Sequence, residues 1–241
     1  MKKFLVVVLL LCLGLCCTAC GEEPATGTEL EALLGSAQVG VLQSQAEENL
    51  RAAGISLSAG KTAGANLYFD EYTFTPEDAL YHGFALQREK DVRLRFTPAF
   101  VYRGEEIPSR LAGVEFTVTA EDSADFAAWV RKQLKDAPQL SSRESGVKGD
   151  VYLVRCFSEL TEREYTRLAK MTRQSRMRYG SETDLLNDPL AMLSDDFGEH
   201  LALVRQWQEV PMYKVTLTEN KKGEATLSVE AYGEALYRGL Q

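Results

Sequence analysis

The first segment of this 241-residue chain decides where folding can begin. Lys2 and Lys3 precede an unbroken apolar run over residues 4–15, small residues follow the run, and polar residues begin at Cys20. A short basic start, an apolar stretch and small residues in this order are typical of a secretory signal. A membrane-spanning helix needs about 20 apolar residues, which is more than this run provides. We therefore expect the segment to be removed and the fold to be built from the rest of the chain.

The apolar run ends in the tetrapeptide Cys17-Thr18-Ala19-Cys20. This tetrapeptide resembles the lipobox of bacterial lipoproteins, in which a signal peptidase cuts before a cysteine whose sulfur has been acylated. That family usually has an aliphatic residue three positions before the cysteine, where this chain has Cys17. The resemblance covers the leader alone, and it implies that Cys20 is lipidated and becomes the mature N-terminus. The alternative is an ordinary secretory signal cut after Ala19, which would give a freely soluble product.

The length and composition of the chain predict that it consists of three segments. We expect a signal peptide at residues 1–19, a tether at residues 20–28 that is polar and rich in turn formers, and a single domain at residues 29–241. The hydrophobic content of 45% and the charged content of 26% are ordinary for a globular protein, so a packed core is expected rather than disorder. With Cys20 lipidated, this domain would be anchored to the cell membrane on its extracytoplasmic side.

The net charge and the number of cysteines limit which partners and which stabilising cross-links this protein can have. The formal net charge of −8 argues against nucleic acid as a partner. Of the five cysteines, four lie within residues 12–20, so the domain keeps Cys156 alone and cannot form an internal disulfide. The fold must therefore rest on its hydrophobic core. Because Cys156 lies in the apolar run at residues 151–157, we expect a buried, unreactive thiol rather than a nucleophile.

Hydrophobic periodicity predicts both strands and helices. Strand-like segments lie at residues 67–74, 84–86, 91–97, 114–118, 151–157, 213–218 and 226–229. Helical spacing is found at residues 29–53, with breaks at Gly35 and Gly40, at residues 119–134, with Thr119 as the expected N-cap, and at residues 160–179. We expect residues 151–157 to form a central strand and the last two segments to form a hairpin. The predicted class is α+β, with an antiparallel or mixed sheet backed by helices.

The sequence carries none of the common catalytic or nucleotide-binding signatures that we sought. It has no Gly-x-Ser-x-Gly, no phosphate-binding loop and no dinucleotide-binding glycine pattern. Its two histidines, His82 and His200, lack metal-ligand spacing, and we expect each to be a surface or half-buried side chain. We therefore assign no catalytic residue, expect no metal and no other cofactor, and regard an enzyme as the less favoured class.

One segment departs from the acidic background. At about 100° per residue, Arg163, Arg167, Lys170 and Arg178 fall in one narrow arc of the predicted helix, and we call these four residues the basic ridge. The plain interpretation is a solvated outer face whose charge is offset by acids elsewhere in the fold. The alternative is a contact for an anionic envelope component, such as lipid head groups or a wall-polymer phosphate, or for an acidic protein partner.

Two functional hypotheses remain. The leading one is a non-enzymatic, lipid-anchored extracytoplasmic domain that binds a partner or assembles at the cell surface. The rival is an envelope hydrolase whose site is built from dispersed carboxylates or a histidine. A pocket in which His82 or His200 touches a carboxylate would favour the hydrolase.

Overall fold

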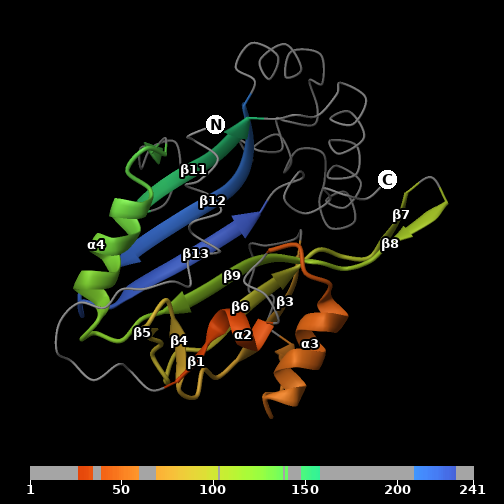
Figure 1. Ribbon diagram of the computed structural model, residues 1–241, viewed down its shortest axis with the longest axis horizontal. Coiled ribbons are helices and arrows are strands. Elements are labelled where there is room, and N and C mark those ends of the chain that lie inside the picture. Colours follow the sequence, from red (N-terminus) through yellow and green to blue (C-terminus); the bar gives the residue numbers. More distant parts are fainter. Residues whose placement is uncertain are drawn as a thin grey trace.

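Strands dominate the structure, and helices are few (Figure 1). This is a computed structural model, and it describes residues 27–34, 39–59, 69–102, 104–137, 139–140, 148–157 and 209–231. The helices in these ranges are α2 (Leu30–Leu34), α3 (Gln43–Ala52) and α4 (Ser123–Gln133). None of these helices is long and apolar enough to cross a membrane.

The main sheet has eight strands, and each is antiparallel to its neighbours. Their spatial order is β10 (Gln139–Leu140), β11 (Asp150–Phe157), β12 (Glu209–Glu219), β13 (Ala225–Ala231), β9 (Leu111–Thr117), β6 (Val92–Phe96), β3 (Asp70–Phe74) and β2 (Ser58–Ala59). The β12–β13 hairpin and the alternating strand β6 are therefore confirmed. β11 lies second from one edge of the sheet, so the expectation of a central strand is wrong.

Two small sheets accompany the main one. In the first, β1 (Thr28–Glu29) runs parallel to β4 (Ala79–Tyr81), and β4 pairs antiparallel with β5 (Phe84–Ala85). In the second, β7 (Phe100–Tyr102) and β8 (Glu105–Ile107) form a hairpin that projects from the main sheet (Figure 1). Because β1 includes Thr28, the end of the expected tether already lies in a sheet.

One face of the main sheet is apolar because the strands alternate in register. Residues directly opposite each other share a face, and two apolar rows cross the sheet. One row contains Phe74, Val92, Phe116, Leu227 and Leu217, and the next contains Tyr72, Leu94, Val114, Val229 and Val215. Most of these side chains are buried, so this face carries the core.

The opposite face of the sheet carries an ion-pair network. Nη1 of Arg93 and Nη2 of Arg95 lie 2.6 Å and 2.8 Å from the two carboxylate oxygens of Glu115. Glu71 on β3 lies 3.1 Å from Nε of Arg93 and 3.6 Å from Nε of Arg95. These cross-strand charges fix the register, since a one-residue slip would move them onto the apolar face.

Helices α2 and α4 both lie on the apolar face of the main sheet (Figure 1). Phe126 of α4 packs against Phe116 of β9 with ring centroids 6.1 Å apart. The guanidinium of Arg131 ties the other end of α4 to Asp150, at 2.8 Å, and to Glu219. The two helices leave a part of the face between them, and the site described below occupies it.

Of the two predictions about helix ends, the structure confirms the break in the first helical segment and contradicts the N-cap at Thr119. The predicted interruption of the first helical segment is confirmed, because α2 and α3 are separate and Gly40 lies in a turn with φ 108°. Thr119 is not an N-cap, because α4 begins four residues later at Ser123. The hydroxyl of Ser123 donates to the carbonyl of Thr119 at 2.7 Å, so the chain between them is held as a turn before the helix.

Several predictions fall outside the described residues. These are the leader with Cys20, the helix expected at residues 160–179 with the basic ridge, and His200. The backbone of Cys156 lies in β11 as expected, whereas its side chain is outside the described part. Val151 and Tyr152, on opposite faces of the same strand, are both buried.

Candidate functional site

The β4–β5 hairpin turn has an unusual backbone. Its two turn residues, His82 and Gly83, have φ values of 51° and 83°, as two-residue hairpin turns with matching strand twist require. Glycine adopts such angles freely, whereas a histidine there stores strain of order 1 kcal/mol. Glu29 of β1 holds the turn in place, because its two carboxylate oxygens accept the N–H groups of His82 and Gly83, each at 2.9 Å. By holding the backbone of the turn, these two hydrogen bonds fix the direction in which the His82 side chain leaves it.

The His82 ring is packed among aromatic side chains. Its centroid lies 4.9 Å from that of Trp129 on α4 and 4.6 Å from that of Tyr81. The side chain is 12% exposed, and Nε2 lies 3.6 Å from Oε1 of Glu31. This separation is too long for a hydrogen bond, so the two groups form a charge pair only when the imidazole is protonated.

Glu31 is the acid at the centre of this arrangement. It projects from α2, and within the described part of the chain its Oε1 atom is buried and accepts no hydrogen bond. Burial raises the pKa of the Glu31 carboxyl above its usual range, the nearby Glu29 carboxylate raises it further, and His82 opposes both effects. Glu31 therefore holds its charge at a cost, which a cation beside Oε1 would relieve.

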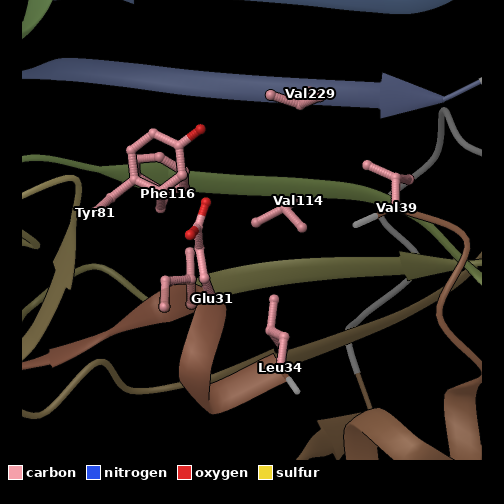
Figure 2. A pocket seen from close by; sticks show the side chains of 8 residues that line it. Glu31, Leu34, Val39, Tyr81, Val114, Phe116 and Val229 are labelled. Atoms are coloured by element: carbon pink, nitrogen blue, oxygen red, sulfur yellow. The ribbon is translucent and has the colours of Figure 1, made fainter. Parts of the chain in front are cut away.

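A hollow lies between α2 and the apolar face of the sheet (Figure 2). It is lined by Leu30, Glu31, Leu34, Val39, Tyr81, Val114, Phe116 and Val229. Its empty volume is about 370 Å³ including space open to solvent, and about 40 Å³ is open to the centres of water molecules. Figure 2 shows the Glu31 carboxylate pointing from the helix toward the rings of Tyr81 and Phe116. We call the hollow, with His82 and Trp129 beside it, the Glu31 site.

Tyr81 supplies the second polar group of the lining. Burial raises the pKa of its hydroxyl first, and the charges of Glu31 and Glu29 raise it further, so the phenol stays neutral. Its ring centroid lies 4.6 Å from that of Phe116, and the ring planes are tilted by 48°. The two rings thus form an aromatic corner beside a carboxylate.

The described residues bring one carboxylate, that of Glu31, and one imidazole, that of His82, to this site. A two-carboxylate hydrolase needs a second acid or base facing the same space. Glu29 is near Glu31, but both of its oxygens already accept backbone N–H groups. Among the described residues that line the hollow there is no serine, cysteine or second carboxylate. Nor do three potential metal ligands gather anywhere in the described ranges.

Sequence reasoning found only part of this site. His82 was singled out and is half-buried as expected, and the structure brings it beside a carboxylate. Glu29, Glu31 and Tyr81 were missed. Glu71 lies elsewhere and has a structural role, since it bridges two arginines of the sheet. A turn residue followed by glycine between apolar residues, as in Tyr81-His82-Gly83-Phe84, was the available signal for the hairpin.

Comparisons of the chain with protein-family models, with curated proteins and with solved structures found no match. The role of the Glu31 site is therefore argued from its own chemistry.

Proposed function

We propose that this protein is a lipid-anchored extracytoplasmic domain of the α+β class that binds a partner at the cell surface, and that the Glu31 site is a place of binding. The observation that carries the proposal is the buried Oε1 atom of Glu31, which accepts no hydrogen bond from the described residues and faces a hollow open to solvent. A carboxylate held in this way costs stability unless it is paired. Concave, mostly apolar hollows with one placed polar group are typical of ligand sites.

The position of the site supports action at the membrane. β1 includes Glu29 and directly precedes Glu31, so the site lies at the start of the described fold. At about 3.5 Å per residue, the segment from Cys20 to Thr28 can reach at most about 28 Å. A lipid on Cys20 would therefore keep the Glu31 site within reach of the bilayer surface, where its effective concentration for envelope ligands is high.

The anchor is tested by replacing its cysteine. In a bacterial host, Cys20→Ala should release the protein from the membrane fraction or leave it as an uncleaved precursor. Metabolic labelling with a fatty acid should mark the wild-type protein and not the variant. A fully processed variant that stays in the membrane fraction would contradict the lipid anchor and indicate another attachment to the membrane.

The basic ridge remains the proposed contact for an anionic envelope component or an acidic partner. Its support is the sequence alone, namely the narrow arc that Arg163, Arg167, Lys170 and Arg178 share on the predicted helix. Nucleic acid is not proposed as a partner, because the net charge of the chain is −8.

A second candidate function has one observation in its favour. Burial raises the pKa of Glu31, which lies beside His82, and a carboxyl group in apolar surroundings can act as a general acid. An envelope hydrolase built on it would lose its activity in Glu31→Gln. The test is cleavage of purified cell-wall fragments by the wild-type protein and this variant. Equal cleavage by both, or by neither, would remove this candidate.

A further inference from the structure

We infer that the Glu31 site binds a small primary ammonium group, with the ammonium against the Glu31 carboxylate and the ring faces of Tyr81 and Phe116, and its alkyl carbons against Leu34, Val114 and Val229. This inference rests on the proposed binding function and names the ligand class of the same site.

The polar atoms of the hollow select the charge of the ligand. A carboxylate only accepts hydrogen bonds, and a primary ammonium group only donates them, with three N–H bonds to offer. Oε1 of Glu31 is buried and accepts none from the described residues. The neighbouring carboxylate of Glu29 adds negative potential: the pKa of the Tyr81 hydroxyl is raised mainly by burial, and further by the charges of Glu31 and Glu29. An anion would meet repulsion here, and a neutral ligand would leave the carboxylate uncompensated.

The walls select the remainder of the ligand. The aromatic faces of Tyr81 and Phe116, with centroids 4.6 Å apart, offer cation–π attraction to a positive group. The rest of the lining is aliphatic, and Leu34, Val114 and Val229 would contact alkyl carbons. The space open to water centres, about 40 Å³, admits a few non-hydrogen atoms. An ethylammonium-sized group fits these limits, whereas a whole sugar or a dipeptide does not.

A neutral His82 does not replace the ligand. Its Nε2 is 3.6 Å from Oε1 of Glu31, beyond hydrogen-bond distance. Glu29 holds both N–H groups of the turn that carries His82. The ring is also packed on Trp129. A protonated His82 would pair with the carboxylate at this distance, so the ammonium ligand has Glu31 to itself only when the imidazole is neutral.

Two sources of such a group are distinguished by experiment. The ammonium could belong to a soluble alkylamine or to the ethanolamine head group of a lipid, which the proposed anchor would bring near. Both present the same primary ammonium to Glu31.

The test uses full-length protein in a non-ionic detergent, with methyl groups labelled for NMR. Ethylammonium chloride and ethanol, two probes of equal non-hydrogen size, are titrated at constant ionic strength. We expect ethylammonium, and not ethanol, to shift the methyl signals of Leu34, Val114 and Val229 to saturation. Glu31→Gln should weaken this binding at least tenfold. The matched control is Glu77→Gln, because Glu77 is an exposed carboxylate paired only loosely with Arg88 at 3.5 Å.

A second measurement does not depend on the fold of any variant. The affinity of the wild-type protein for ethylammonium should rise as pH rises through the Glu31 titration, because the ammonium needs the ionised carboxylate. Vesicles of phosphatidylethanolamine with phosphatidylglycerol, compared with phosphatidylglycerol alone, then identify the source. Methyl shifts with the first vesicles support the lipid head group, and shifts with the soluble probe alone support a soluble amine.

Two results would overturn the inference in different ways. Equal, saturable binding of ethanol and ethylammonium, unchanged in Glu31→Gln, would show that the hollow binds ligands but does not select an ammonium group. Absence of methyl shifts with either probe up to about 100 mM, about five orders of magnitude above a micromolar Kd, would refute both the ammonium group and the proposed use of this hollow for binding.

Discussion

Glu29 offers the sharpest test of how the site is held together, and Glu29→Ala is the perturbation. The substitution removes both acceptors of the His82–Gly83 turn at once. The N–H of His82 is partly buried, and losing a charged acceptor there should cost about 1.5–3 kcal/mol. The N–H of Gly83 is exposed, so water replaces the lost bond at a cost well below about 1 kcal/mol. We therefore expect the free energy of unfolding to fall by about 2 kcal/mol.

The assay is urea unfolding followed by circular dichroism, with two comparison variants. Glu29→Gln keeps one acceptor oxygen and should lose about half as much stability as the alanine variant. Glu77→Ala removes an exposed carboxylate and should stay within about 0.5 kcal/mol of wild type. If Glu29→Ala unfolds at the same urea concentration as Glu77→Ala, the carboxylate does not hold the turn, and the argument that His82 is fixed beside Glu31 fails.

Three further predictions concern Glu31, the basic ridge and the core. The folded pKa of Glu31 is raised, so its protonated form stabilises the fold below about pH 4.3, and this contribution is lost as pH rises through the folded pKa. Glu31→Gln should therefore gain stability relative to wild type between pH 4 and pH 8 in urea unfolding, and a pH-independent difference would contradict the raised pKa. Reversing Arg163, Arg167 and Lys170 to glutamate should weaken binding to anionic vesicles by on the order of 3 kcal/mol at low salt, and added salt should weaken wild-type binding in the same way. Equal binding by the variant and the wild type would show that the basic ridge is only a solvated surface. Phe96→Ala, in a fully buried position of β6, should cost about 3–5 kcal/mol in urea unfolding, and a cost under about 1 kcal/mol would mean that this face is not the core.

Much of the sheet could be predicted because its signals are local. In β6 the alternation of Val92, Leu94 and Phe96 with two arginines reports which side faces the core, and the structure buries all three apolar residues. The β12–β13 hairpin could likewise be predicted from two alternating runs around a polar turn. Alternation is set within a strand, so it is visible without knowing the partners.

The candidate site could not be predicted, because it depends on pairing between distant segments. Glu29 contacts His82 across 53 positions of sequence, through a parallel pairing of β1 with β4 that no local pattern encodes. Residues 29–31 were assigned to one helical segment, and the change from strand to helix between Glu29 and Leu30 is what separates the two acids. Thr119 shows the same limit, since α4 begins instead at Ser123, whose hydroxyl accepts the N–H of the distant Ala225. Local propensity cannot anticipate such tertiary contacts.

The central claim is that Glu31, whose Oε1 atom is buried and accepts no hydrogen bond from the described residues, binds a cation. A direct titration of its carboxyl carbon by NMR tests this claim. In the wild-type protein without ligand, the pKa of Glu31 should lie above the usual glutamate value of about 4.3. Saturating ethylammonium should lower that pKa, because the bound cation favours the ionised carboxylate. An ordinary pKa that does not change when ethylammonium is added would contradict the claim.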